Sequence, residues 1–393
     1  MKKYLWIFIT ALLLASCSAQ ETEEQASGSA TASAVTYTVT TDDVTTRGAI
    51  ANTAEFLTDG RQFRVWAFMK KDGSSDEWTA MTSDYSETPL QAVDVTYVAW
   101  RNEWLTYDAD HNTVVYYWPR PEYKVNYYAV YPNENYFNTT NKTLDYTVAA
   151  NNTGTDLMYA TVQGQRDGTE RPNQRKAVEL TFHHALTQIS FYGQLHSDLV
   201  SLGWQVDVNS ITLCNVMSQG SLALRTDGTS DQQCENPSSP VNYSLAMNAD
   251  RQTISAATIP QDGEGNDIPL TSSTNIAMLL PQQLTAWNNA SETSGTTTPT
   301  TDGCYLAVSL MVKDSENSPV FGSDPITVFS PFDCGVADGW KSGLRYKYTL
   351  TIKGGYNAKG SPVISPMGIT AAIQPWNTDA APDGTATHKP ANN

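Results

Sequence analysis

Short runs in which apolar and polar residues alternate constrain the fold of this chain more than any other feature. Residues 63–69, 125–131 and 346–352 place apolar side chains at every second position. Successive side chains of a β-strand point to opposite faces of a sheet, so this period indicates strands with a buried face. Turn-forming pairs such as Asp72-Gly73 and Gly354-Gly355 separate the runs. The pattern therefore predicts an all-β chain of sandwich or barrel type.

The first 16 residues have the pattern of an export signal. Lys2 and Lys3 precede an apolar run, residues 4–14, that is too short to span a bilayer. Residues 14–17, Leu-Ala-Ser-Cys, match the bacterial lipoprotein box, in which Cys17 receives the lipid. An ordinary signal peptide followed by a chance cysteine is the alternative. Several acyl chains, such as palmitate, on Cys17 would hold the protein durably on the outer membrane, whereas a single chain binds only marginally.

The rest of the 393-residue chain is too long for one small sandwich and predicts two domains. Residues 18–34 are mostly Ser, Ala, Thr, Gln and Glu, which favours a flexible tether. A polar, basic segment at 164–176 interrupts the strand pattern, and we place the domain boundary there. The predicted divisions are a signal peptide at 1–16, a lipidated tether with the first strand at 17–47, an N-terminal sandwich at 48–176, a C-terminal sandwich at 177–376 and a polar tail at 377–393.

Charge and motifs exclude several functions. The net charge of −17 argues against a nucleic-acid partner, because phosphates need a basic protein face. The sequence contains no G-x-S-x-G, H-E-x-x-H, P-loop or Rossmann glycine pattern. The adjacent His183 and His184 would point to opposite faces of a strand, so they are poorly placed to share a metal ion. We therefore expect no enzyme, no metal and no cofactor.

Four cysteines follow Cys17 in the sequence. In an oxidising exterior they could form two disulfides by any of three connectivities, of which Cys214 with Cys234 and Cys304 with Cys334 are the local pairings. The sequence does not choose among the three. Reduced, buried thiols are the alternative, and the spacing is unlike that of a CxxC zinc site.

Several motifs, taken in order behind the lipoprotein box, resemble the fimbrillin family. Residues 183–191 are similar to the His-Ala-Leu segment and aromatic-ended strand that open the second domain of these proteins. The other similar segments are 128–132, 279–282, 340–348 and 373–376. The resemblance spans residues 17–376. It implies two transthyretin-like, immunoglobulin-like β-sandwich domains in tandem, in a subunit that assembles into type V pili by strand exchange and supports adhesion.

Strand exchange makes specific demands on such a subunit. A sheet that lacks one strand exposes unpaired backbone groups beside open core pockets, and a neighbour's strand can fill them. In the monomer, residues 35–40 would fill this groove, with Val35, Tyr37 and Val39 in alternate pockets. The family is cut at an arginine, and Arg47-Gly48 lies just past this strand in a Thr-rich loop that suits an arginine-specific maturation protease. The alternative is that Arg47 is an ordinary linker residue with no role in cleavage.

The strand that is donated should come from elsewhere in the chain. Ile369, Ala371 and Ile373 alternate with the same period as the first strand, so we predict residues 367–376 as the donor for another copy or a related pilin. The alternative is that this strand completes its own second domain. The polar tail that follows is unexpected for a shaft subunit, so an anchor or tip accessory subunit also fits.

A carbohydrate-binding surface lipoprotein is the main rival interpretation. Residues 97–131 are dense in aromatics, namely Trp100, Trp104, Tyr107, Tyr116, Tyr117 and Trp118. Exposed coplanar aromatic rings stack on sugars, but strands more often use aromatics for cross-strand pairs and core filling. A coplanar exposed pair beside polar residues would favour sugar binding, whereas a groove covered by residues 35–40 would favour strand exchange.

Overall fold

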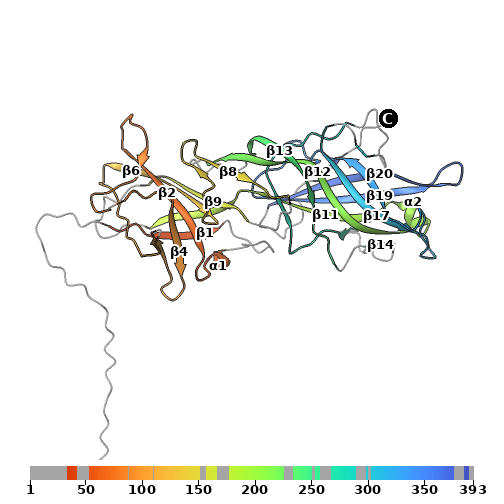
Figure 1. Ribbon diagram of the computed structural model, residues 1–393, viewed down its shortest axis with the longest axis horizontal. Helices are drawn as coiled ribbons and strands as arrows, with labels where there is room; N and C mark the ends of the chain where they lie inside the picture. Colours follow the sequence, from red (N-terminus) through yellow and green to blue (C-terminus); the bar gives the residue numbers. More distant parts are fainter. Residues whose placement is uncertain are drawn as a thin grey trace, which may run out of the picture. The chain divides into compact units, whose positions relative to one another are not determined.

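The computed structural model describes residues 33–41, 53–86, 88–108, 110–150, 156–165, 177–224, 233–249, 253–256, 267–288, 298–299, 302–375 and 385–388. These residues are mostly β-strand, in three sheets (Figure 1). The prediction of an all-β chain built as β-sandwiches is confirmed. The helices of this part of the chain, α1 (Thr53–Phe56) and α2 (Ser197–Ser201), are short. No described helix is long and apolar enough to cross a membrane.

The first sheet runs in the order β1-β10-β9-β6-β2-β4-β5, with β3 beside β2. Its strands are β1 (Tyr37–Thr41), β2 (Gln62–Lys71), β3 (Thr79–Ala80), β4 (Val93–Val98), β5 (Glu103–Tyr107), β6 (Tyr123–Tyr131), β9 (Met158–Gln165) and β10 (Val178–His184). Neighbouring strands are antiparallel except β1, which runs parallel to β10.

The second sheet runs in the order β15-β11-β19-β20-β21, with β16 beside β11. Its strands are β11 (Thr187–Leu195), β15 (Ile268–Pro269), β16 (Ala277–Leu279), β19 (Leu344–Tyr356), β20 (Pro362–Pro375) and β21 (Thr385–His388). The apolar side chains of β19 at 346, 348, 350 and 352 are buried and alternate with half-buried polar ones, which confirms this half-buried strand.

The third sheet runs in the order β18-β17-β12-β8-β7, with β13 and β14 beside β12. Its strands are β7 (Phe137–Asn138), β8 (Thr143–Thr147), β12 (Gln205–Ala223), β13 (Glu235–Ser244), β14 (Thr253–Ile254), β17 (Tyr305–Lys313) and β18 (Ile326–Pro331). The long strand β12 pairs with four others, so it joins the ends of this sheet.

Two hydrophobic cores hold these sheets. The first core lies on one face of the first sheet and includes Val35, Tyr37, Val39, Phe56, Phe63, Val65, Tyr127 and Phe182. The second core includes Phe191, Tyr348 and Leu350 of the second sheet and Val208 and Leu310 of the third. It also takes in Trp66, Phe68, Tyr128 and Val130, on the opposite face of β2 and β6. These two strands therefore bury both faces, which their alternation alone does not predict.

Strand pairing crosses the predicted boundary in both directions. The strand β10, just after residue 176, pairs with β9 and β1 in the first sheet. The strand β8, well before it, pairs with β12 in the third sheet. The segment 166–176 itself lies outside the described residues, and the domain limits stay a prediction.

Candidate strand-exchange site

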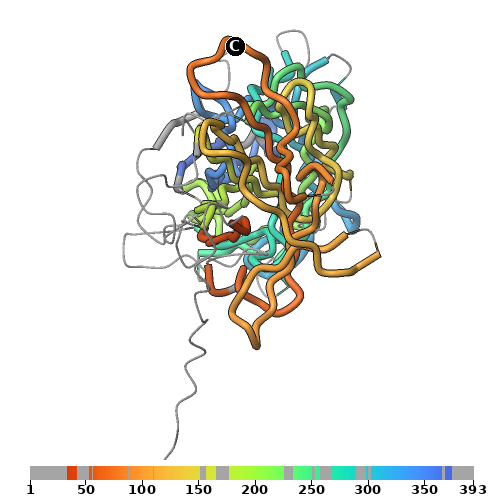
Figure 2. Tube along the Cα trace, turned by 90° about the vertical axis from the view of Figure 1, so that its left-hand side faces the viewer, coloured from red at the N-terminus to blue at the C-terminus, as the bar shows by residue number. Residues whose placement is uncertain are grey.

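The first strand occupies the edge of the first sheet. Residues 37–41 pair in parallel register with residues 178–182 of β10, and the sheet ends there. Figures 1 and 2 show β1, at the red end of the colour scale, beside the yellow-green β10. An edge strand has a ladder on one side only, so its departure leaves the other pairings of the sheet intact.

Alternate side chains of this strand enter the first core. Val35, Tyr37 and Val39 are 9%, 7% and 4% exposed, whereas the threonines between them face solvent. The Tyr37 ring packs edge-on against Phe63, with ring centroids 6.1 Å apart and an angle of 89° between the planes. Phe63 in turn packs against Phe182 of β10, at 5.2 Å between centroids. The strand therefore closes the edge of a continuous aromatic core.

Backbone hydrogen bonds fix the N-terminal half of this segment, which we call the plug segment (residues 33–41). The Val35 N–H donates to the Tyr116 carbonyl at 2.7 Å, and the Trp118 N–H donates to the Ser33 carbonyl at 2.9 Å. The ladder to β10 then begins, where the Val178 N–H donates to the Thr36 carbonyl at 2.7 Å. The plug segment thus passes from one neighbour to another along its length.

The C-terminal end of the plug segment is held by side chains. The Thr41 N–H donates to the Thr53 hydroxyl at 3.1 Å, at the start of α1. The Thr40 and Thr181 hydroxyls bond each other across the ladder at 3.1 Å. The Thr41 and Thr53 hydroxyls also bond each other, at 3.2 Å. These contacts are polar, so they fix the position of the strand without adding much apolar burial.

Two polar atoms in the core beside the plug segment have no hydrogen-bond partner among the described residues. They are the Tyr37 hydroxyl and the Trp118 indole N–H, and both are shielded from solvent. Burial raises the pKa of the Tyr37 phenol far above its ordinary value, and the nearby Tyr116 phenol adds to the effect. Tyr37 is therefore neutral at any physiological pH.

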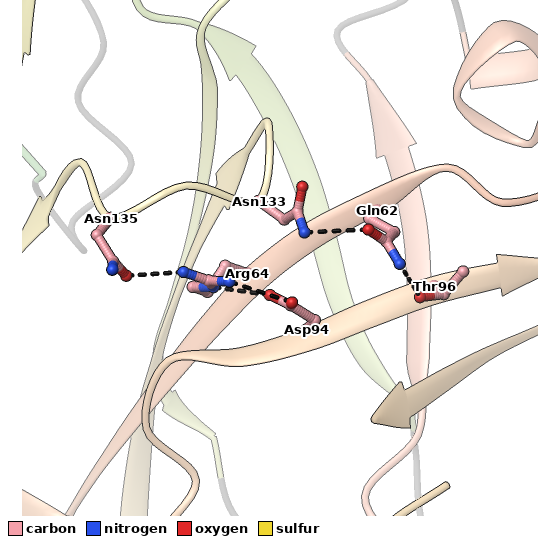
Figure 3. Close-up of polar contacts among 6 residues, drawn as sticks. All are labelled: Gln62, Arg64, Asp94, Thr96, Asn133 and Asn135. Carbon is pink, nitrogen blue, oxygen red and sulfur yellow. Dashed lines mark hydrogen bonds and ion pairs between the residues drawn. The ribbon is translucent and has the colours of Figure 1, made fainter. Parts of the chain in front are cut away.

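On the opposite face of β2, a polar cluster ties neighbouring strands together (Figure 3). The Arg64 guanidinium makes two bonds to the Asp94 carboxylate, at 2.7 and 3.1 Å, and a third to the Asn135 side chain at 2.8 Å. Gln62 donates to Thr96 at 3.0 Å and accepts from Asn133 at 3.0 Å. Because these contacts join β2 to β4 and to the loop after β6, they brace the sheet whose edge holds the plug segment.

Comparison with known proteins decides the family. A family model described as fimbrillin-like matches residues 46–376, most of the chain. The chain belongs to the fimbrillin-like family. No curated protein matches the sequence.

Two solved structures of fimbrial proteins are similar to this fimbrillin-like chain. A fimbrial protein from Bacteroides vulgatus is 13% identical, and the match covers 87% of this chain and 99% of that one, with a TM-score of 0.48. The fimbrial anchor protein Mfa2 from Porphyromonas gingivalis is 10% identical, and the match covers 88% and 98%, with a TM-score of 0.34.

The predicted lipidation and processing residues, Cys17, Arg47 and Gly48, lie outside the described residues.

The predicted donor residues lie in β20, which pairs antiparallel with β19 in the second sheet. Ile369 and Ala371 are each 1% exposed, and Ile373 is half-buried against the second core. In this monomer the strand therefore fills its own sheet, and its role as a donor stays a prediction. The strand β21, which the sequence did not predict, lies in the predicted polar tail and pairs with β20.

The four cysteines Cys214, Cys234, Cys304 and Cys334 are buried free thiols in the structure. Burial raises the pKa of Cys234 and of Cys334 to about 12, and that of Cys304 to about 11. Such thiols react slowly, because the thiolate is the reactive form. Disulfide pairing between them stays a prediction.

Most of the aromatics at 97–131 fill cores instead of forming a platform. Trp104 packs against Phe63, and Tyr116 and Trp118 are buried in the first core. Trp100 is 78% exposed at the β4–β5 turn, with the Arg101 guanidinium 4.5 Å from its ring centroid. The rings of Tyr85 and Tyr117 are 6.0 Å apart but 58° from parallel, so this pair is not coplanar.

The histidine pair is split between two faces, as the strand period requires. His184 is buried, and its Nδ1 lies 2.9 Å from the Asp156 carboxylate. His183 is half-buried beside the Tyr159 ring. Within the described part of the chain, no three His, Cys, Asp or Glu side chains gather as metal ligands would.

Proposed function

We propose that this fimbrillin-like chain is a pilus subunit that reaches the cell surface as a lipoprotein, through Cys17 in the outer membrane. An arginine-specific protease cuts after Arg47 and removes the lipid anchor together with the plug segment. The groove then takes a strand from another copy or a related pilin, and the resulting fimbria supports adhesion. The observation that carries the proposal is the edge position of β1, whose alternate side chains close the first core.

The free energy lost when the plug segment leaves its groove favours its replacement by another strand over an empty groove. Burying a side chain of the size of Val or Phe is worth roughly 1.5–3 kcal/mol, so Val35, Tyr37 and Val39 together contribute roughly 4–9 kcal/mol. A whole domain is stable by only about 5–15 kcal/mol. A subunit that has lost its plug segment is therefore driven to capture another strand, by β-augmentation at the open edge of β10.

The cleavage step is tested with the mature lipoprotein, an arginine-specific protease and an Arg47→Ala variant. Cleavage at Arg47 should convert monomer to high-molecular-weight polymer, and Arg47→Ala should stay monomeric with an unchanged unfolding transition. Arg61→Ala, which alters an arginine past the expected cut, is the matched control and should polymerise normally. Normal polymers from Arg47→Ala would contradict the cleavage step.

For the donor strand we propose residues 367–376, of which residues 367–375 lie in β20. Among the described residues its ladder partners are β19 and the short β21, so its release removes one side of the second sheet. Substituting Ile369 or Ile373 with Asp would also disturb the subunit's own second core, because both pack there. Cross-linking between copies is therefore the sharper test.

The cross-linking test mixes two variants and polymerises them together. One copy carries Glu179→Cys on the solvent face of β10, and the other carries Thr370→Cys on the face of β20 opposite Ile369. A short bis-maleimide should yield cross-linked dimers from the mixed polymer and none from polymers of either variant alone. Polymers that form normally and give no mixed dimer would exclude this donor.

A terminal accessory pilin is the second candidate, and β21 favours it. The strand β21 pairs with residues 369–372 and so covers the free edge of the predicted donor. A subunit held in this way accepts a strand but donates none. Removing residues 377–393 separates the two candidates: polymerisation that begins only after this truncation indicates an accessory subunit.

A further inference from the structure

The plug segment places a polar atom, the Tyr37 hydroxyl oxygen, in an apolar pocket. The Tyr37 hydroxyl is buried in the first core and has no partner among the described residues. Buried polar groups are bonded in the great majority of cases, because an unbonded one has lost its water without replacement. An unpaired hydroxyl therefore weakens the strand that brings it into the core.

Four other buried tyrosines have hydrogen-bond partners for their hydroxyls. The Tyr97 hydroxyl donates to Asn102 at 2.7 Å, and the Tyr348 hydroxyl donates to the Cys334 carbonyl at 2.7 Å. The Tyr346 and Tyr243 hydroxyls donate to the carbonyls of Gly339 and Val148. Tyr37 thus differs from these tyrosines, and it lies in the strand that the proposed function requires to be replaced.

The backbone pairing of the plug segment also lowers its stability. The ladder between β1 and β10 is parallel, whereas the other ladders of the first sheet are antiparallel. Parallel pairing is slightly less stable per residue than antiparallel pairing. The side chain and the ladder are independent features, and both lower the stability of the same strand.

We propose that Tyr37 keeps the plug segment replaceable and selects the strand that replaces it. The preferred incoming strand carries an aliphatic side chain or a phenylalanine in the Tyr37 pocket, beside Phe63, and so brings no hydroxyl into the core. This inference rests on the proposed function, since it assumes that the strand is exchanged. Within this chain the isoleucines of β20 meet the requirement, and Ala371 between them is too small to fill an aromatic pocket.

The test is hydrogen exchange on the intact, uncleaved chain, which needs neither protease nor polymer. In Tyr37→Phe, the amides of residues 37–41 and 178–182 should exchange roughly 10- to 100-fold more slowly than in the parent, about 1.4–2.8 kcal/mol at 1.4 kcal/mol per factor of ten. Tyr97→Phe is the matched control, because it deletes a bonded hydroxyl of the same sheet. It should leave exchange in β1 unchanged or faster.

A second readout follows polymerisation after cleavage at Arg47. Polymer should form more slowly from Tyr37→Phe than from the parent, since the plug must leave before a donor enters, while Tyr97→Phe should keep the parent rate. Exchange in β1 that is unchanged or faster in Tyr37→Phe would overturn the role of the hydroxyl, whatever the polymer assay gives. A parent chain that keeps β1 after cleavage and never polymerises would instead overturn the proposed function.

Discussion

Shortening Val39 by two methyl groups should loosen the plug segment and leave the rest of the molecule unchanged. Val39 is 4% exposed and lies in the first core, opposite Leu180 in the ladder register. Each buried methyl-sized group is worth about 0.8 kcal/mol, and the cavity left behind adds to this loss. Val39→Ala should therefore cost about 2 kcal/mol. This corresponds to a roughly 30-fold rise in the population of the open strand.

Hydrogen exchange on the intact chain measures this opening residue by residue. The amides of residues 37–41 should exchange about 30-fold faster in Val39→Ala, while amides in β19 keep the parent rate. Thr38→Val is the matched control: it changes an exposed side chain of the same strand, keeps the branched shape and should alter exchange by less than about 0.5 kcal/mol. Equal acceleration in β1 and β19 would mean that the strand opens only when the whole chain unfolds, which refutes the reasoning.

Three further predictions follow from contacts elsewhere in the chain. Arg64→Ala removes the paired bonds to a carboxylate and should lower the free energy of unfolding by about 1–2 kcal/mol in a urea titration, whereas Arg120→Ala, at an exposed ion pair, should change it by less than about 0.5 kcal/mol. Tyr348→Phe leaves a buried carbonyl and a buried indole N–H without their partner, so it should cost about 2–3 kcal/mol, and the exposed Tyr356→Phe should cost nothing measurable. The pKa of Cys334 is raised from 9.0 to about 12, so its contribution to stability is complete below pH 9 and is lost as the pH rises towards 12. The unfolding free energy should therefore fall between pH 9 and 12, and fall less in Cys334→Ala. An equal fall in both proteins would contradict this assignment.

The alternation of apolar residues predicted the strands but not their partners. Val35, Tyr37 and Val39 stand out by their period, and the structure buries all three. The partner strand β10 begins 141 residues further on, as the contact of Thr40 with Thr181 illustrates. A period of two is common to parallel and antiparallel strands, so the sequence contains no signal for the direction of this ladder.

Other features of the site were hidden for identifiable reasons. Phe182 directly precedes the His183-His184 pair that marks the family motif, yet its packing against Phe63 depends on a strand from far earlier in the chain. The segment 116–118 stands out in the sequence only by its aromatics, although its backbone holds the start of the plug segment. Composition suggested a polar tail at 377–393, and β21 forms there because β20 offers a free edge, a condition that the local sequence does not reveal.

The measurement that tests the central claim most directly is the N-terminal residue of this protein in high-molecular-weight material sheared from its native cells. Strand exchange after removal of the plug segment predicts that the sequence begins at Gly48. Polymers whose subunits still begin at lipidated Cys17, with the plug segment in place, would contradict it.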